Sequence, residues 1–367
     1  MKRRQFLSGA GVGAVAAASA LPAPAVAQSG PEIKWRLASS FPKSLDTIYG
    51  AAEIISKRVA EITDNRFQIR VFAGGEIVPG LQVLDAVQNG TVECGHTAAY
   101  YYVGKDPTFA FDCAVPFGLN ARQQNAWLHY GGGMELLREF YAGYNVVNFT
   151  AGNSGAQMGG WFRKEIKTPA DLSGLKIRIA GLAGQVMTKL GAVPQQIAGG
   201  DIYPALEKGT IDAAEWIGPY DDEKLGFFKV AQHYYYPGWW EPGPSFSLYV
   251  NKAAWDGLPP AYKAAIEAAS AEANVRMVAK YDAANPAALK RLVGSGAKLQ
   301  PYPREVLAAA YKATFELYDE LSAANPRFKK IYDNWKVFRE EDYTWFRISE
   351  NYLENFTYAA AAQAKKG

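Results

Sequence analysis

The chain has 367 residues, 49% hydrophobic and 20% charged, with 39 Lys and Arg against 36 Asp and Glu. The positive excess comes from Lys2, Arg3 and Arg4, so residues 28–367 are electrically balanced and carry no signature of a nucleic-acid or anionic-membrane partner. A chain of this length can bury a large core, and its length indicates two lobes rather than one.

Residues 1–27 have the features of an export signal. Three basic residues precede a small apolar run from Gly9 to Leu21, and Ala25-Val26-Ala27 is a small-x-small cleavage site. The pair Arg3-Arg4 indicates a twin-arginine signal, with an ordinary secretory signal as the alternative. The apolar run is short for a membrane anchor, and no later apolar span is long enough to cross a bilayer. We therefore expect an exported, periplasmic protein.

The segments that follow have the order β-α-β-α-β. Alternating or apolar stretches predict strands at 33–40, 66–73 and 91–97, and helical spacing predicts helices at 44–63 and 80–89. This order favours a parallel sheet covered by helices.

The same order recurs later in the chain. Strands are predicted at 176–179, 193–197 and 210–216, with helices at 182–190 and 202–208. Residues 85–93 align with residues 204–212 without a gap. The alternative is chance similarity, because a helix followed by glycine and a strand is a common sequence pattern. Because ligands of open α/β sheets bind beyond the carboxyl ends of the strands, His96, Thr97, Glu215 and Trp216 are expected to face one cleft.

The fold expected from this repeat is α/β, a two-lobed clamp in which each lobe is a mostly parallel sheet covered by helices. The first lobe comprises 28–150 and parts of 245–335, and the second comprises 151–244. The remaining elements are a glycine-interrupted helix at 125–144, extended segments at 145–162 and 246–251, and helices at 260–285, 303–324, 326–340 and 341–362. Residues 336–367 form a long C-terminal helix rich in aromatic side chains, which is suited to packing on a partner subunit.

Catalytic patterns are weak throughout the chain. None of the three histidines lies in a metal-binding pair, and Ser154 fails the G-x-S-x-G pattern at its last position. Cys94 and Cys113 form no CxxC motif, so they are either a disulfide or two buried thiols.

Charged residues next to apolar strands are the better candidates for a site. The planar fork of Arg178 can hold a carboxylate by two parallel hydrogen bonds, and a structural ion pair is the alternative. Glu215 and Glu241 would repel each other in an apolar cleft unless they are protonated or bridged by a cation, to which Gln157 can add an amide oxygen. The alternative is that Glu215 and Glu241 are separate, solvated surface acids. Tyr100 and its neighbours either line a pocket or belong to the core.

The chain resembles the extracytoplasmic solute-binding proteins of tripartite ATP-independent periplasmic (TRAP) transporters. The residues that carry the resemblance are Ser39-Ser40-Phe41-Pro42, Phe72-Ala73-Gly74-Gly75-Glu76, residues 172–178, Leu190-Gly191-Ala192-Val193-Pro194 and residues 205–215. Glu215-Trp216 and Gly238-Trp239-Trp240-Glu241-Pro242-Gly243 look most like the branch that binds 2-oxo acids or lactate with a metal ion. Ala180 departs from the family, in which proline is common near the arginine.

This resemblance implies hinge closure on a ligand, whose carboxylate Arg178 binds. It implies a cation, Na⁺ in the first place and Ca²⁺ as the alternative, held by Gln157, Glu215, Glu241 and the backbone carbonyl of Trp216. The substrate contacts would come from Arg178, Gln157, Tyr100, Glu215 and Trp216. Glu215 then serves the metal and leaves Arg178 free. The C-terminal helix is similar to one exchanged between the subunits of a homodimer.

The function predicted from these observations is a periplasmic binding protein for a small monocarboxylate, a 2-oxo acid such as pyruvate. It would bind this ligand with a cation and deliver it to the membrane subunits of a TRAP permease. The alternatives are an exported enzyme acting on oxo or hydroxy acids, a lactate-binding protein of the same family, and a signalling co-receptor of the same fold.

Overall fold

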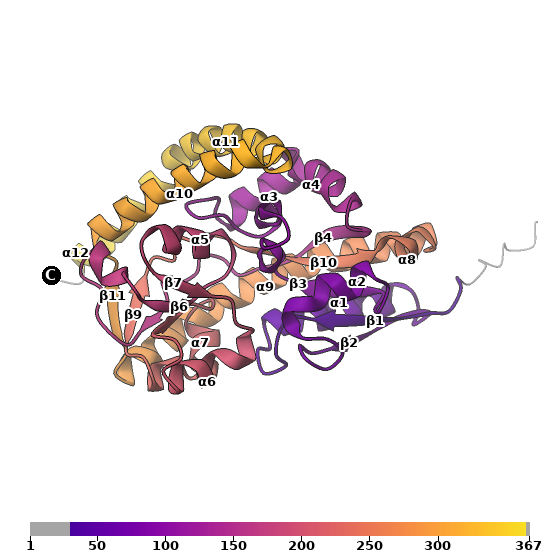
Figure 1. Ribbon diagram of the computed structural model, residues 1–367. Coiled ribbons are helices and arrows are strands. Elements are labelled where there is room, and N and C mark those ends of the chain that lie inside the picture. Colours follow the sequence, from indigo (N-terminus) through magenta and orange to yellow (C-terminus); the bar gives the residue numbers. More distant parts are fainter. Residues whose placement is uncertain (1–29, 365–367) are drawn as a thin grey trace, which may run out of the picture.

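Two mixed β-sheets, each covered by helices, organise the chain (Figure 1). The computed structural model describes residues 30–364, so the predicted signal at 1–27 lies outside the described residues. Within that range no helix is long and apolar enough to span a membrane. One continuous hydrophobic core runs through both sheets and the helices around them.

The first sheet has the strand order β2-β1-β3-β10-β4. Its strands are β1 (Ile33–Ser39), β2 (Phe67–Phe72), β3 (Cys94–Thr97), β4 (Val146–Asn153) and β10 (Ser245–Asn251). The helices α1 (Ile48–Ile62) and α2 (Val83–Gln88) connect the three parallel strands, as the sequence predicted. Ile48, Ile55 and Val59 of α1 are buried, which confirms the apolar stripe of that helix.

The second sheet repeats this plan in the order β11-β9-β5-β8-β6-β7. Its strands are β5 (Trp161–Phe162), β6 (Lys176–Arg178), β7 (Val193–Gln195), β8 (Ala213–Ala214), β9 (His233–Tyr236) and β11 (Lys298–Pro301), and its connecting helices are α5 (Gly181–Lys189) and α6 (Ile202–Glu207). β6 lies between β7 and β8 as β1 lies between β2 and β3. The repeat predicted from the sequence is therefore present.

Both sheets are mixed, and each is mostly parallel as predicted, with a single strand, β10 or β5, that runs opposite to the others. Beside the parallel trios, β10 pairs antiparallel with β3 and β4, and β5 pairs antiparallel with β8 and β9. These strands lie outside the two β-α-β-α-β units, because the chain crosses between the sheets at 154–160 and again at 237–244. β11 also pairs with β9, so residues 298–301 lie with the second sheet, outside the 151–244 expected for that lobe.

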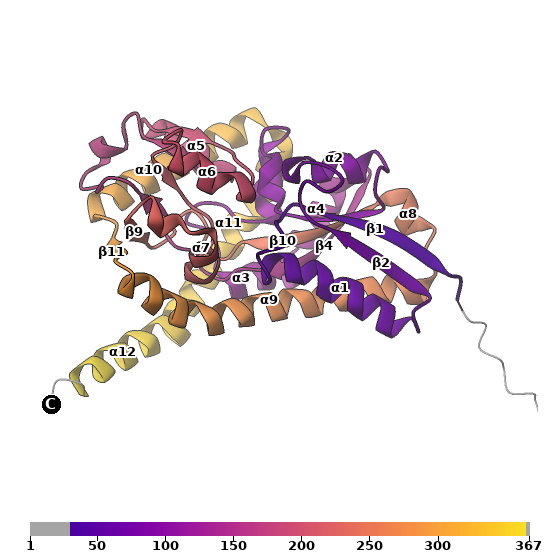
Figure 2. The same ribbon diagram turned by 90° about the horizontal axis from the view of Figure 1, so that it is seen from below.

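A single long helix, α9 (Pro260–Gly294), lies along both sheets (Figure 2). Its first half packs on α1 and β4, and its second half packs on α7 (Pro219–Leu225). The sequence predicted an end at residue 285, but the helix continues through Pro286. A proline in a helix interior removes one backbone hydrogen bond, and the burial of Ala288 and Leu292 beyond it compensates for that loss.

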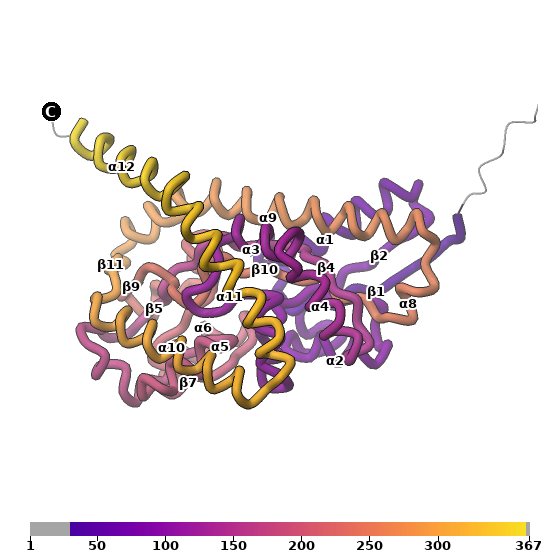
Figure 3. Tube along the Cα trace, turned by 90° about the horizontal axis from the view of Figure 1, so that it is seen from above, coloured from indigo at the N-terminus to yellow at the C-terminus, as the bar shows by residue number. Residues whose placement is uncertain are grey.

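The remaining helices are α3 (Ala121–Tyr130), α4 (Gly133–Ala142), α8 (Lys252–Asp256), α10 (Arg304–Ala324), α11 (Pro326–Phe346) and α12 (Tyr352–Ala364), with a π-helical turn at Arg347–Asn351. Of these, α10 and α11 lie on the side of the molecule away from α9, whereas α3 and α8 contact α9 (Figure 3). The C-terminal helix thus begins at Pro326 and not at residue 336. α11 buries Phe328, Ile331 and Trp335, whereas α12 has no buried residue and projects from the body. Both cysteines are buried and free.

Candidate functional site

The six predicted site residues come together in one buried region between the two sheets. Arg178 ends β6, Glu215 and Trp216 directly follow β8, and Tyr100 lies in a 3₁₀ turn at Ala99–Tyr102 after β3. Gln157 and Glu241 lie on the two crossing segments at 154–160 and 237–244. All six side chains are between 0 and 4% exposed. The carboxyl ends of the strands therefore face the space between the lobes, as expected for α/β sheets.

Arg178 is held by three hydrogen bonds from two of the three nitrogens of its guanidinium group. Nε donates to the carbonyl of Ile197 at 3.1 Å, and Nη1 donates both to the carbonyl of Glu215 at 2.8 Å and to Glu215 Oε1. The guanidinium carbon lies 5.0 Å from the centre of the Trp216 ring. Within residues 30–364, Nη2 is buried and has no hydrogen-bond partner.

This geometry corrects the expectation that Glu215 leaves Arg178 free. The strands β6 and β8 are neighbours with Arg178 opposite Ala214, so the next residue, Glu215, lies beside the guanidinium group. A buried cation also requires a counter-ion, because the unpaired charge would be strongly destabilising. Only Nη2 of the fork remains for a ligand carboxylate.

Three side-chain oxygens in this region have no hydrogen-bond partner among the described residues. They are Gln157 Oε1, Glu215 Oε2 and Glu241 Oε1. Buried polar atoms are almost always paired, so such a group points to a missing ligand or ion. Amide and carboxylate oxygens are ligands that hard cations such as Na⁺ and Ca²⁺ accept. Residues 30–364 contain no group of three or more His, Cys, Asp or Glu side chains that could hold a metal, so a cation here would also need the amide oxygen of Gln157 or backbone carbonyls.

The two carboxyl groups differ in their surroundings. Burial raises the pKa of Glu215 from 4.5 to about 7, although the charge of Arg178 opposes this shift. The pKa of Glu241 is raised well above its usual value by burial and by the negative charge of Glu215, while the hydroxyl of Tyr100, which donates to Glu241 Oε2 at 3.2 Å, opposes the shift. The site thus carries more negative than positive charge when both acids are ionised, which favours a cation.

Backbone contacts hold the two crossing segments together. Gln157 N donates to the carbonyl of Glu241 at 3.1 Å, and Gly238 N donates to the carbonyl of Gln157 at 3.0 Å. A Cβ atom at Gly238 would lie 2.6 Å from that Gln157 oxygen, so glycine is required for the close approach. The side chain of Asn153 adds a further link, because it donates to the carbonyl of Gly243 at 3.0 Å.

Other residues near the site have structural roles or were not predicted. His96 is buried at the end of β3, its Nε2 lies 3.3 Å from the Ala151 carbonyl, and burial lowers its pKa to about 4, so it has a structural role. Sequence reasoning missed Gln196, which donates to the Tyr101 carbonyl at 2.8 Å, and also missed the linking role of Asn153. The run Tyr100-Tyr101-Tyr102 could have indicated that Tyr101 lies near the site, whereas no local sequence pattern distinguishes Gln196.

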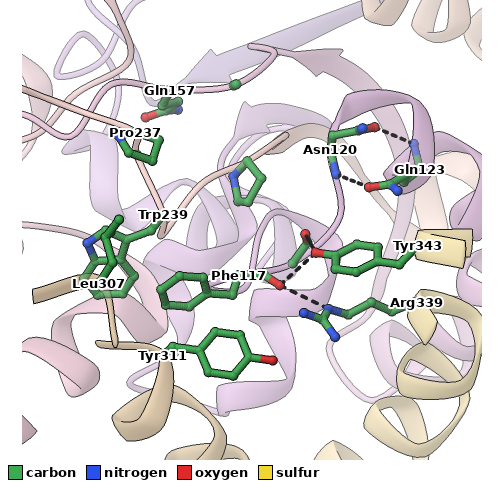
Figure 4. A pocket seen from close by; sticks show the side chains of 14 residues that line it. Phe117, Asn120, Gln123, Gln157, Pro237, Trp239, Leu307, Tyr311, Arg339 and Tyr343 are labelled. Carbon is green, nitrogen blue, oxygen red and sulfur yellow. Dashed lines mark hydrogen bonds between the residues drawn. The ribbon is translucent and has the colours of Figure 1, made fainter. Parts of the chain in front are cut away.

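A separate apolar pocket of about 420 Å³ lies beside the crossing segments (Figure 4). Its walls include Phe117, Trp239, Leu307, Tyr311, Arg339 and Tyr343, and Gln157 also borders it. The rings of Phe117 and Trp239 stack at 5.2 Å. Trp239 therefore lines a pocket, while Tyr234 belongs to the core, stacked on Trp161 at 3.9 Å.

Comparison with known proteins places this arrangement in a family. The family described as "Bacterial extracellular solute-binding protein, family 7" matches residues 38–325. A monocarboxylate 2-oxoacid-binding periplasmic protein of Nostoc sp. is 53% identical over 360 residues, which cover 97% of this chain and 99% of the relative.

Solved structures agree with this assignment. A TRAP transporter solute-binding protein from Bordetella bronchiseptica, crystallised as a dimer with calcium and picolinate in one of its sites, is 59% identical with a TM-score of 0.90, covering 91% of this chain and 99% of that one. A TRAP periplasmic solute-binding protein from Pseudoalteromonas atlantica, with bound sodium and pyruvate, is 40% identical with a TM-score of 0.85, covering 88% and 99%.

These matches confirm the predicted two-lobed binding-protein fold and favour a binding protein over an exported enzyme. The chain belongs to family 7 of the bacterial extracellular solute-binding proteins, and it is a solute-binding protein of the TRAP transporter type.

Proposed function

We propose that this protein binds a small 2-oxo monocarboxylate such as pyruvate together with a cation in the periplasm, and presents the ligand to a TRAP permease. The observation that carries the proposal is the buried region in which the unpartnered Arg178 Nη2 lies with three unpartnered oxygens from Gln157, Glu215 and Glu241. The relatives that bind 2-oxo acids, pyruvate with sodium, or picolinate with calcium support it.

The charges of the site explain why ligand and cation would bind together. Arg178 carries one positive charge, and Glu215 and Glu241 carry two negative charges when ionised, so a monocarboxylate entering alone would meet net repulsion. A bound cation would supply the positive charge that balances these acids. Gln157, Glu215, Glu241 and the backbone carbonyl of Trp216 would hold it, and Arg178 Nη2 would donate to the ligand carboxylate.

Titration calorimetry on the mature protein tests this function. Pyruvate is titrated in three buffers that contain choline, Na⁺ or Ca²⁺ as the only added cation, with chelator in the choline and Na⁺ samples. We expect binding of pyruvate only with Na⁺ or Ca²⁺. Lactate in the same buffers tests the alternative ligand. Equal affinity in all three buffers would contradict the cation site, and an absence of binding by any 2-oxo acid would contradict the function.

We also infer a homodimer in which α12 packs on a second copy. Large apolar side chains of the segment 345–358 are between 60 and 78% exposed, namely Trp345, Ile348, Tyr352, Leu353, Phe356 and Tyr358. Soluble monomers rarely expose a contiguous apolar surface of this kind. The apolar pocket of Figure 4 opens where α11 leads into this segment, and it offers a surface for the second copy's helix. One similar solved structure is a dimer.

A further inference from the structure

A cluster of charged side chains joins the two lobes at a point away from the ligand site. We call it the Asp46 cluster, formed by Asp46, Tyr220, Lys224 and Lys280. Asp46 lies in the loop before α1 of the first lobe, whereas Tyr220 and Lys224 lie on α7 of the second. Asp46 Oδ1 pairs with Lys224 Nζ, and Asp46 Oδ2 accepts hydrogen bonds from Tyr220 Oη at 3.1 Å and Lys280 Nζ at 2.8 Å.

The position of Lys280 on α9 shows why this point is mechanically important. Before it, Tyr262 donates to the Pro31 carbonyl at 2.8 Å and Glu272 pairs with Arg58 at 2.6 Å, both in the first lobe. After it, Tyr281 donates to Asp221 at 2.8 Å and Arg291 pairs with Glu223 at 2.7 Å, both in the second lobe. Lys280 therefore lies where α9 passes from one lobe to the other. It also donates to the Asp46 backbone carbonyl at 2.9 Å.

The charges within the cluster are complementary. One carboxylate faces two ammonium groups and one phenol, and Lys224 Nζ lies 3.7 Å from the centre of the Tyr220 ring. Burial opposes ionisation of Asp46, but hydrogen bonds from Lys224 and Lys280 outweigh it and lower its pKa to about 2. Single exposed ion pairs stabilise proteins little, whereas a carboxylate shared by several partners forms a network with a larger effect.

We propose that the Asp46 cluster is a latch that stabilises the closed arrangement of the two lobes and thereby slows the release of ligand. The proposal rests on the proposed function in one respect, namely that ligand is held between lobes that close. Asp46 touches none of the six site residues in the described structure, so its effect should fall on the lobe equilibrium and on the dissociation rate. The crossing segments, by contrast, connect the lobes in either arrangement.

Two measurements test the latch with the variant Asp46→Asn. Stopped-flow tryptophan fluorescence, with pyruvate and Ca²⁺, measures the dissociation rate. We expect Asp46→Asn to release pyruvate about three to ten times faster, since it removes two ion pairs. Adding choline chloride at constant Ca²⁺ should reduce the difference between the variant and the unmodified protein, because exposed charges are screened.

Spin-label distances between the lobes provide a test without ligand. Labels are placed at Gln68→Cys in the first lobe and Lys208→Cys in the second, both exposed, while Cys94 and Cys113 are buried. Asp46→Asn should shift the distances to longer values. This result would support the latch even if the protein bound no 2-oxo acid, so the two proposals can fail separately.

A matched control separates the latch from a general effect of charge. Asp256→Asn removes the exposed ion pair of Asp256 with Lys252, which lies within α8, and should change neither measurement. Adding Lys224→Met to Asp46→Asn should add little to the single variant, because both changes break the same contact. Release rates and distance distributions of Asp46→Asn that equal those of Asp256→Asn would overturn the proposal.

Discussion

At the scale of single residues, Arg178 has two different sets of contacts. Nε and Nη1 are committed to the Ile197 carbonyl and to Glu215, and these bonds fix the guanidinium plane. Nη2 is buried and has no partner among the described residues, and the same is true of Glu215 Oε2 and Glu241 Oε1. Glu215 can therefore neutralise Arg178 through Oε1 and contact a cation through Oε2. Pairing with arginine and binding of metal are compatible roles for this residue.

These contacts predict a double effect of Arg178→Met. Loss of the charged donor should weaken pyruvate binding about 100-fold, because charge-assisted hydrogen bonds are strong. The variant should also lose about 3–5 kcal/mol of unfolding free energy without cation, because Glu215 is left buried and unpaired. Calorimetry and urea unfolding measure the two effects. Lys176→Met, exposed on the same strand, is the control, and unchanged affinity in Arg178→Met would contradict the role of the arginine.

Asp222 predicts the pH dependence of stability. It is buried and accepts hydrogen bonds from Tyr234 Oη at 2.7 Å and Trp161 Nε1 at 3.0 Å, and burial raises its pKa from 3.8 to about 7. Because the folded protein binds this proton more tightly than the unfolded chain, the contribution to stability is full below pH 3.8 and is lost as the pH rises to about 7.

Asp222→Asn should therefore flatten the fall of Tm between pH 4 and pH 8 without abolishing it. Burial also raises the pKa of Asp112 and of Asp221 to about 6 and that of Glu215 to about 7, so these three groups contribute slope in the same direction. Differential scanning calorimetry across this range measures the effect. A variant with the same slope as the unmodified protein would show that Asp222 does not titrate in this window.

At the scale of elements, α11 is connected to the crossing segment that carries Glu241. Arg339 Nε donates to the Phe117 carbonyl at 3.1 Å, and Tyr343 Oη donates to the Gly118 carbonyl at 2.6 Å. Phe117 N in turn donates to the Trp239 carbonyl at 2.7 Å. A partner helix in the pocket of Figure 4 would therefore contact the same residues that position the cation ligands.

The proposed homodimer can be tested with substitutions in α12 of the whole protein. Leu353→Asp combined with Phe356→Asp should convert the dimer to a monomer, because a charged side chain cannot be buried in an apolar interface without a partner. Light scattering after gel filtration gives the molar mass. Asn355→Asp adds charge at an exposed polar position of the same helix and should leave the dimer intact. A dimer that persists in the double variant would mean that α12 is not its interface.

The sequence predicted those elements that depend on local pattern. The apolar stripe of α1 and the repeat of residues 85–93 in 204–212 led to the correct succession of strands and helices, and the ends of β6 and β8 led to Arg178 and Glu215. The continuation of α9 beyond Pro286 and the strand β11 were not predicted. Proline normally indicates the end of a helix, and the four residues Lys298–Pro301 give only a weak local signal for a strand. Contacts with residues distant in the sequence determine both elements.

At the scale of the whole molecule, the site depends on contacts that no local pattern encodes. Gln157 and Glu241 lie on crossing segments without periodic apolar residues. Residue chemistry alone left them as candidate ligands beside the alternative of separate solvated acids, and the family resemblance implied their shared cation. In the Asp46 cluster, Lys224 and Lys280 lie 178 and 234 positions after Asp46 in the sequence, so no local pattern around Asp46 predicts these contacts. Residues that lie where lobes meet are determined by the relative placement of two folded units, and this placement follows only from the complete packing.

The continuity of α9 has a mechanical consequence for this protein. The helix has 35 residues, so it is about 50 Å long, and each half is fastened to a different lobe. If the lobes separate, α9 cannot rotate freely as a loop would. A change in the angle between the lobes therefore requires α9 either to bend or to give up part of its packing on one of them.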